Sequence, residues 1–391
     1  MSELLDFYST NSLSWEQLEY GTKAIMNLHY GLIHVGLPTM VDLTRDNLPN
    51  IKEDNMPKNF ELCKEGDVAF ADASEDTNEV AKPIEFFDLA GKNIVCGLHT
   101  IHGRDNKNKT VIGFKGYAFS SSAFHNQIRR IAQGTKIYSI STKNFSECFI
   151  GIPSKVEQTK IATLLRLIDE RIATQNKIIE KYESLIKGLN DSLYAQYGDD
   201  VLTSFSSLGF SYSGLSGKSA QDFGSGKPFI TYLNVYSNNI INEKDFQYVA
   251  IKEGEKQNVV EYGDVLFTLS SETPEEVGIG SVYLGNENVY LNSFCFGIHI
   301  INTKIAFPPY LSYYVSSTPF RKFIYPYAQG STRFNLCKVD FEKASIKLPS
   351  LENQKRIYSI LSHIESKTET EKSLLDLYNS QKQYLLRQMF I

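Results

Sequence analysis

The segment IPSKVEQTKIATLL, residues 152–165, has a second copy in LPSLENQKRIYSIL, residues 348–361. Each copy begins with an aliphatic residue, proline and serine, and each has glutamine in the same later position, at Gln158 and Gln354. The two glutamines are 196 positions apart in a chain of 391 residues. The chain therefore contains an internal repeat of about half its own length.

The repeat extends toward the N-terminus of each copy. AQGTK at 132–136 matches AQGST at 328–332, and Phe124 and Phe145 match Phe320 and Phe341, all with the offset of 196. EGDVAFADASEDTNEV at 65–80 matches YGDVLFTLSSETPEEV at 262–277 with an offset of 197, and GLH at 97–99 matches GIH at 297–299 with an offset of 200. Small changes of offset indicate loop insertions. The chain is interpreted as a tandem duplication, with variable domains at 1–152 and 198–348 and similar helical regions at 153–197 and 349–391.

Composition excludes several protein classes. Chains beyond about 250–300 residues usually divide into domains, and 42% hydrophobic residues are enough for folded cores. The five cysteines are odd in number, scattered and without a CxxC pair, so we expect reduced thiols in a cytoplasmic protein. The N-terminus lacks the apolar region of a signal peptide, and no apolar run reaches the ~18 residues of a membrane helix.

The variable regions contain short β-type runs, such as VLFTL at 265–269, separated by Gly, Asn, Asp and Pro. Helical patches such as SSSAFHNQIRRIA at 120–132 lie between them. This mixture predicts an α/β domain in each half, with a barrel-like or strongly curved sheet.

The similar regions have the 4,3 spacing of a heptad seam. Polar residues Thr368, Glu371 and Lys382 interrupt the second seam. We expect an α+β protein whose two long helices form an antiparallel coiled coil with an internal pseudo-two-fold repeat, in which facing residue numbers add to 550. The alternative is an amphipathic surface helix on each domain. The predicted seam comprises Ile161, Leu165, Ile168, Ile172, Gln175, Ile179, Tyr182, Ile186, Leu189 and Leu193, then Ile357, Leu361, Ile364, Thr368, Glu371, Leu375, Tyr378, Lys382, Leu385 and Met389.

The order variable, helix, variable, helix resembles the specificity subunits of type I restriction–modification systems. The resemblance rests on AQGTKIYSIS with IPSKVEQTKIATLL, on AQGSTRFNLCKVDFEKASIKLPSLENQKRIYSIL, and on GKPFITYLNVYSNN at 226–239 and EYGDVLFTLSSETPEEVG at 261–278. It implies that each variable domain recognises one half of a bipartite, asymmetric site in double-stranded DNA. It also implies that the helices dock two methyltransferase subunits, which bind S-adenosylmethionine, and that restriction subunits add ATP- and Mg-dependent activity. This chain would then be neither an enzyme nor a cofactor-binding protein.

The charge distribution agrees with DNA binding, although the net charge of −5 taken alone argues mildly against it. Residues 101–143 contain eight basic side chains and only Asp105 as an acid, and residues 299–343 contain six against two. Two basic segments at equivalent places in a repeat indicate two surfaces that contact phosphates. The alternative is an ordinary solvated charged face.

Glycine lets the backbone approach a ligand, glutamine recognises adenine, and arginine or lysine recognises guanine or phosphate. The AQG segments, NLHYGLIH at 27–34 and ITYLNVYSNN at 230–239 combine such groups. For any single residue here, core packing is an equally good interpretation. The candidate DNA-binding residues are Tyr30, His34, Arg104, Lys107, Lys109, Arg129, Arg130, Gln133, Thr135, Lys136, Tyr232, Asn234, Tyr236, Asn238, Arg321, Lys322, Gln329, Ser331, Thr332 and Arg333.

Sequence motifs give little support to the alternative of a fused methyltransferase or nuclease. AFPPYLSYY at 306–314 has Phe307 where adenine methyltransferases need Asn or Asp, so we expect a helix start there. GLSGKS at 214–219 lacks the first glycine of a phosphate-binding loop, and DFGSG at 222–226 is expected to be a plain loop. CGLHTIH at 96–102 offers Cys96, His99 and His102, but on one strand residues three apart face opposite sides, so no metal site is predicted. A scaffold without DNA recognition would have no need for two diverged domains.

Overall fold

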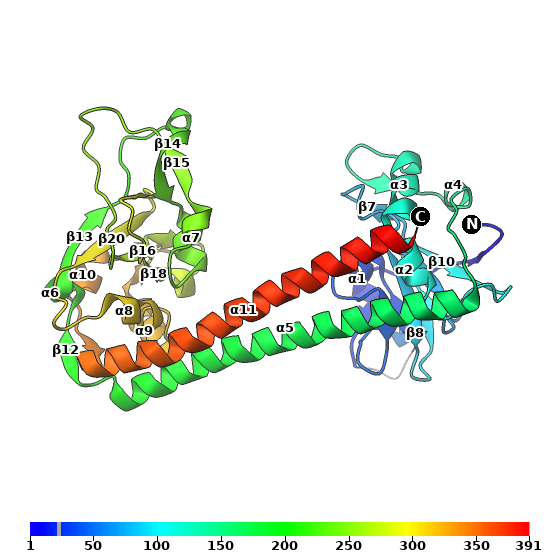
Figure 1. The fold of residues 1–391 in the computed structure, drawn as a ribbon, viewed down its shortest axis with the longest axis horizontal. Helices are drawn as coiled ribbons and strands as arrows, with labels where there is room; N and C mark the ends of the chain where they lie inside the picture. Colours follow the sequence, from blue (N-terminus) through cyan, green and yellow to red (C-terminus); the bar gives the residue numbers. More distant parts are fainter. Residues whose placement is uncertain (22–24, 391) are drawn as a thin grey trace. The chain divides into compact units, whose positions relative to one another are not determined.

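The computed structural model describes residues 1–21 and 25–390. These residues form two compact units, Met1–Lys177 with Lys372–Ile391, and Ile178–Glu371. Each unit contains one α/β domain and a part of each of two long helices, α5 (Lys155–Tyr197) and α11 (Leu351–Met389) (Figure 1). None of the described helices has the length and apolarity that a membrane span requires.

The described residues of the first unit form three sheets. Their strand orders are β1-β10-β6-β8-β4, β2-β5-β3-β9 and β11-β7. The strands are β1 (Asp6–Tyr8), β2 (Leu18–Glu19), β3 (Met26–Leu28), β4 (Met40–Asp42), β5 (Asn50–Ile51), β6 (Val68–Ala71), β7 (Ala73–Ser74), β8 (Pro83–Asp88), β9 (Ile94–Cys96), β10 (Thr100–Arg104) and β11 (Tyr138–Ser139).

Short helices pack around these sheets. The serine Ser121 caps one of them by accepting a hydrogen bond from the Phe124 backbone N–H, and Phe124 with Phe70 and Phe145 forms an aromatic core. The helices are η1 (Trp15–Gln17), α1 (Tyr30–His34), η2 (Glu53–Asn55), α2 (Lys115–Phe119), α3 (Ser122–Ile131) and α4 (Thr142–Phe145).

The second unit repeats this design. Its strand orders are β13-β20-β16-β18, β15-β14-β19, β17-β22-β21 and β12-β23. The strands are β12 (Val201–Thr203), β13 (Gly209–Ser213), β14 (Phe223–Ile230), β15 (Gln247–Val249), β16 (Val265–Thr268), β17 (Ser270–Ser271), β18 (Gly280–Val282), β19 (Tyr290–Leu291), β20 (Cys295–Ile300), β21 (Ala328–Gln329), β22 (Phe334–Leu336) and β23 (Ile346–Leu348).

Several of its helices occupy positions equivalent to those of the first unit. Ser317 caps α9 as Ser121 caps α3, and the buried Phe320 and Phe341 confirm the predicted match to Phe124 and Phe145. The helices are α6 (Phe205–Leu208), η3 (Ala220–Asp222), α7 (Tyr232–Ser237), η4 (Glu243–Asp245), η5 (Pro274–Glu276), α8 (Pro308–Tyr314), α9 (Thr318–Ile324), η6 (Tyr325–Tyr327) and α10 (Lys338–Lys343).

Strand register corrects one part of the repeat alignment. His102 pairs with Ala69 across β10 and β6, and Gly297 pairs with Leu266, the repeat counterpart of Ala69, across β20 and β16. His102 thus corresponds to Gly297, and two residues later Arg104 corresponds to His299. The predicted match of GLH with GIH is wrong, because three identical letters carry less information than the register of a paired strand.

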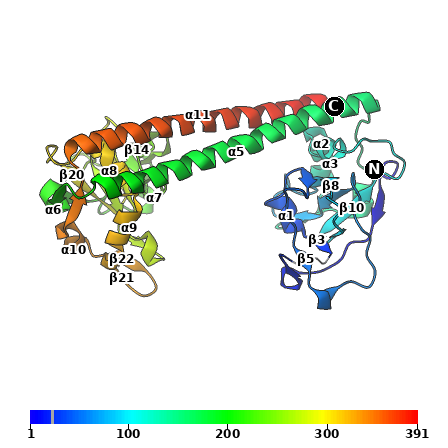
Figure 2. The same cartoon turned by 90° about the horizontal axis from the view of Figure 1, so that it is seen from below.

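The two long helices run antiparallel within each unit, which confirms the predicted fold class. Figures 1 and 2 show α5 and α11 running side by side. In the first unit Leu165 of α5 and Leu386 of α11 are buried in one cluster, and Asp169 forms a 2.6 Å ion pair with Lys382. In the second unit Leu189 and Leu193 of α5 pack against a cluster that contains Ile357 and Leu361. The residue numbers 169 and 382 add to 551, one residue from the expected register.

The predicted seam is protected from solvent along both helices, since every one of its 20 positions is buried or half-buried. Lys382, a polar interruption of the second seam, has a partner in Asp169. A charge at a seam position is tolerated here because its counter-ion comes from the facing helix.

Candidate nucleic-acid interface

The repeated glutamines attach each domain to the first turn of the helix that follows it. The Gln158 side chain accepts a hydrogen bond from the Val111 N–H at 2.9 Å and donates to the carbonyls of Lys109 and Pro153. Gln354 makes the same three bonds, at 2.7–2.8 Å, with positions 307, 305 and 349. Both amides are buried.

A second pair of equivalent contacts lies further along α5 and α11, toward the C-terminus of each helix. Tyr117 donates to Asp169 at 2.8 Å, and Tyr313 donates to Glu365. These tyrosines belong to α2 and α8, and their hydrogen bonds connect the two short helices to α5 and α11. The opening segment therefore occurs twice because the same attachment is built twice.

The AQG segments form an exposed hairpin in each unit. Gln133 pairs with Ser139 in the first, and Gln329 pairs with Asn335 in the second. Gly134 and Gly330 have φ of +137° and +144°. A Cβ at Gly134 would lie 1.9 Å from the Ile137 carbonyl oxygen, and the equivalent contact at Gly330 would be 2.1 Å. The glycines thus serve the tightness of the hairpin itself, whereas the sequence suggested closeness to a ligand.

The two hairpin tips share a backbone and differ in side chains. The first presents Gln133, Thr135 and Lys136 with Ile137, which is 62% exposed. The second presents Gln329, Ser331, Thr332 and Arg333, all exposed. Arg333 also donates to the Ser270 hydroxyl at 3.2 Å and lies over the exposed Phe294 ring.

Helices α1 and α7 reach the strand beside each hairpin. In the first unit the His34 imidazole lies 2.9 Å from the Ala73 carbonyl oxygen of β7, and in the second Tyr232 donates to the Ser270 carbonyl of β17 at 2.8 Å. Ala73 and Ser270 are repeat counterparts, since the matched segments begin at 65 and 262. Each unit therefore has a surface made of a short helix, a strand and a hairpin, which we call the helix–hairpin surface.

Other predicted residues of these helices have defined places. Tyr30 packs its ring against His34 and His99, and Tyr236 donates to Glu276 at 2.7 Å while its ring stacks on that of Tyr232. Asn234 differs from the prediction, because it is buried and its amide bonds to Asn242 and Asn238. Asn234 holds the loop after α7, and its amide is not available to a base.

The arginines and lysines divide into exposed and structural groups. Arg129 and Arg130 in the last turn of α3 and Lys322 in α9 are exposed. Arg321 donates to three carbonyls of residues 275, 277 and 278, each at 2.7 Å, so it fastens the loop after β17. Lys107 and Lys109 are exposed in the loop before α2, which is bonded to the start of α5 and is separate in sequence from the hairpin.

Arg104 is the clearest departure from the predicted DNA contacts. Its guanidinium is buried, donates to both oxygens of Asp67 and to Glu61, and lies 4.5 Å above the Tyr8 ring centre. Burial raises the pKa of the Asp67 carboxyl, but hydrogen bonds from His102 and Arg104 outweigh it and the pKa is lowered. Arg104 therefore compensates a buried carboxylate.

The enzyme-like motifs have structural explanations in the described residues. Pro308 begins α8, which confirms the predicted helix start, and Lys218 of GLSGKS is bonded to Glu255 at 2.6 Å. The prediction that DFGSG is a plain loop is wrong. Residues 223–226 form the start of strand β14, which has a bulge opposite β15. CGLHTIH is not one strand: a turn at 98–99, with His99 at φ +54°, separates Cys96 in β9 from His102 in β10.

The comparisons with known proteins agree on one family. A model of the type I restriction modification DNA specificity domain matches residues 216–377. The S subunit of a type I restriction–modification system from M. genitalium is similar over 100% of this chain and 94% of its own, with a TM-score of 0.51 and 16% identity. A structure described as showing complex assembly and conformational transition of the type I system covers 91% of this chain and 95% of its own, with a TM-score of 0.57 and 17% identity. At these identities the structures show a shared fold. No curated protein sequence matches the chain.

Proposed function

We propose that this chain, which belongs to the type I restriction–modification DNA specificity family, recognises a bipartite and asymmetric DNA site with its two domains. The observation that carries the proposal is the helix–hairpin surface, which occurs in both units with one backbone design and two sets of side chains. A common scaffold with different exposed polar groups suits two half-sites of different sequence.

The exposed charges support contact with the DNA backbone. Arg129, Arg130 and Lys136 in the first unit, and Lys322 and Arg333 in the second, are exposed on or next to the hairpins. Cations that neutralise phosphates release counterions, so binding should weaken as salt rises. The amide and hydroxyl groups of the tips are the candidates for base edges.

The long helices each expose an apolar side chain at equivalent positions of the repeat. Leu164 on α5 and Ile360 on α11 are repeat counterparts, and their side chains are 41% and 39% exposed. Because the two positions are equivalent by the repeat, we take them as candidate contacts for two similar partner subunits. We infer that these are methyltransferase subunits that bring S-adenosylmethionine, and that restriction subunits bring ATP and Mg.

The test is the salt dependence of DNA binding by the chain assembled with its methyltransferase partner. Single alanine substitutions of Lys136, Lys322 or Arg333 should each lower the slope of log K against log salt by about 0.9 for each phosphate that the native side chain neutralises. A residue that contacts a base would instead lose discrimination at one base pair.

The matched control is Arg321→Ala. Arg321 is a neighbour of Lys322, yet its guanidinium is committed to three carbonyls, so its removal should lower stability and leave the slope unchanged. If all three exposed-residue variants bound DNA with the wild-type slope, the helix–hairpin surface would not be the DNA-binding surface.

A further inference from the structure

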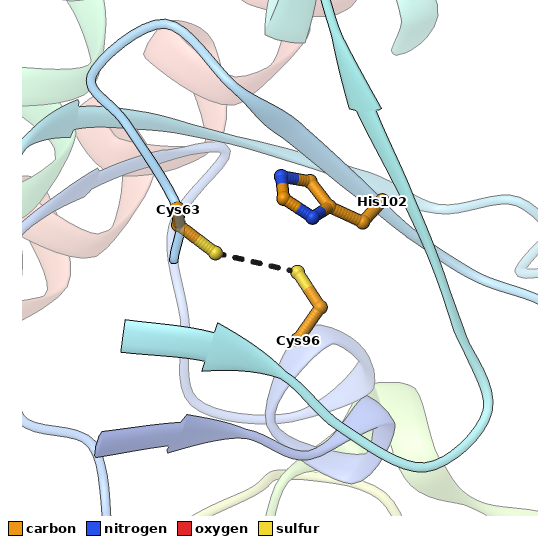
Figure 3. A group of neighbouring side chains, drawn as sticks. All are labelled: Cys63, Cys96 and His102. Atoms are coloured by element: carbon orange, nitrogen blue, oxygen red, sulfur yellow. Dashed lines mark hydrogen bonds between the residues drawn. The ribbon is translucent and has the colours of Figure 1, made fainter. Parts of the chain in front are cut away.

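Two thiols and an imidazole lie together inside the first unit, and both cysteines belong to a core cluster that also contains Ile33 of α1. The Cys63 and Cys96 sulfur atoms are 3.6 Å apart, and a nitrogen of His102 completes a group whose atoms all lie within 4.8 Å of one another (Figure 3). All three side chains are at most 5% exposed. They come from the segment before β6, from the end of β9 and from β10.

The imidazole is held in the orientation of a metal ligand. His102 Nε2 lies 2.7 Å from an Asp67 carboxylate oxygen, whereas Nδ1 is buried and has no hydrogen-bond partner among the described residues. Figure 3 shows the ring and both sulfur atoms facing one space. A carboxylate on one ring nitrogen fixes the tautomer and leaves the other nitrogen with a lone pair, as in carboxylate–histidine–zinc sites.

The second unit shows that the fold does not require these residues. The backbone N–H of Cys63 donates to the carbonyl of Ile94. In the second unit the backbone N–H of Val260 donates to the carbonyl of Val289 in the same way, so Val260 is the counterpart of Cys63. Cys96 pairs with Leu28 as Leu291 pairs with Ile230. The three counterparts are Val260 for Cys63, Leu291 for Cys96, and Gly297 for His102.

Apolar groups therefore fill this position in the second unit. The Tyr212 ring occupies the space beside Gly297, where an added Cβ would lie 2.1 Å from the ring, and Tyr212 packs in one cluster with Val260 and Leu291. A buried cluster of two thiols and an imidazole with a free nitrogen calls for a role beyond packing.

We propose that the first domain binds one thiophilic divalent cation, of which Zn²⁺ is the best match, through Cys63 Sγ, Cys96 Sγ and His102 Nδ1. Zn–S bonds of about 2.3 Å at a tetrahedral angle place two sulfur atoms about 3.8 Å apart, close to the observed 3.6 Å. Two sulfur ligands and one imidazole select zinc over magnesium or calcium. The three side chains leave one tetrahedral position for water or another small ligand.

Charge balance favours a divalent ion. Binding releases one proton from each thiol to solvent, and the two thiolates neutralise the two positive charges of the ion. The adjacent Asp67 is already paired with Arg104 at 2.8 Å, so the buried region stays neutral. A monovalent copper ion on the same two thiolates would leave one uncompensated negative charge.

The experiment measures metal in the full-length chain, purified without chelator, supplied with Zn²⁺ and then separated from free ion. The wild type should retain about one Zn²⁺ per chain, and Co²⁺ in its place should give thiolate-to-cobalt absorption. Zn²⁺ should also raise the unfolding temperature, because an ion that binds only the folded state stabilises it.

The decisive variant is Cys63→Val with Cys96→Leu, which copies the packing of the second unit and should fold, as circular dichroism would verify. It should lose the retained ion, the cobalt absorption and the thermal shift. His99→Ala, which removes the exposed neighbour of the cluster, is the matched control and should lose none of them. Equal metal retention by the double variant, a metal-free wild type with two titratable thiols, or a chain 2 Da lighter from a Cys63–Cys96 disulfide would each overturn the proposal.

Discussion

At the scale of single residues, one buried carboxylate position has different partners in the two halves. Asp67 and Asp264 are repeat counterparts, and both are at most 2% exposed. Asp67 is bonded to His102 and Arg104, whereas Asp264 accepts from Tyr212 at 2.6 Å and lies 2.8 Å from His299. Burial raises the pKa of the Asp264 carboxyl, and the hydrogen bonds that it accepts are too weak to cancel this rise. Burial also raises the pKa of Asp67, but its hydrogen bonds with His102 and Arg104 outweigh burial, so the pKa is lowered.

These opposite directions predict opposite pH dependence. Because the folded pKa of Asp67 is below the unfolded value of about 3.9, its contribution is present above that pH and is lost as pH falls through the folded pKa. For Asp264 the contribution is present below the unfolded pKa and is lost as pH rises through the folded pKa. Asp67→Asn should cost about 3 kcal/mol at pH 7 because it leaves a buried guanidinium without its carboxylate, and Asp264→Asn should cost about 1–2 kcal/mol.

Hydrogen exchange in urea separates the two units, since peptides from β6 and β10 report on one and those from β16 and β20 on the other. The cost of Asp67→Asn should shrink as pH falls toward 3. Equal costs for the two variants at pH 7 would contradict the assignment of Arg104 as the compensating charge.

A second prediction at this scale concerns the hairpin glycines. Gly134→Ala and Gly330→Ala each place a Cβ against a backbone carbonyl oxygen at positive φ, so each should distort its hairpin and weaken DNA binding by about tenfold or more. Gly91→Ala is the control, since its φ is +69° but an added Cβ meets nothing within 4 Å. Wild-type affinity in both hairpin variants would show that the hairpins do not contact DNA.

The sequence predicted which residues are exposed better than it predicted which are buried. The AQG repeats marked two exposed segments because glycine and polar residues in a short run are a local signal of a surface loop. A count of charges could not separate Arg104 from Lys136, because the partners of Arg104 at positions 61 and 67 are 43 and 37 residues away in the chain. Cys63 was missed for the same reason, since 33 residues separate it from Cys96.

At the scale of elements, the attachment of each domain to its helix depends on one amide. Gln158→Ala or Gln354→Ala leaves one buried N–H and two carbonyls without partners, so each should cost about 2–3 kcal/mol in its own unit. Gln196→Ala, on an exposed face of α5, should change stability by less than about 0.5 kcal/mol. The check is again hydrogen exchange, read on peptides from residues 105–120 and 301–316.

An effect of Gln158→Ala no larger than that of Gln196→Ala would mean that water replaces the amide at no cost.

The helices themselves were predictable because a heptad pattern is periodic and needs no knowledge of the partner. The domain sheets were not predictable in the same way, because short strands pair with partners chosen by long-range register. DFGSG illustrates this limit, since its glycines suggested a loop and its pairing with β15 makes it a strand.

At the scale of the whole molecule, the proposed function gives the helix pair a measurable role, which is to set the gap between the two half-sites. Seven residues inserted after Lys177 and seven after Glu371, all continuing the heptad pattern, keep every seam position aligned in both helices. Each insertion adds about 10.5 Å of helix, which corresponds to roughly three base pairs of duplex at 3.4 Å per pair. Three base pairs also rotate one half-site by about 100° around the DNA axis, since a turn contains 10–10.5 pairs.

Methylome sequencing of cells that express the variant with its methyltransferase partner should therefore find either a gap longer by about three pairs or no methylation. An insertion in α5 alone misaligns the seam and should abolish assembly, which controls for the effect of length on its own. Full methylation of the original site by the doubly extended chain would show that the helices do not set the gap.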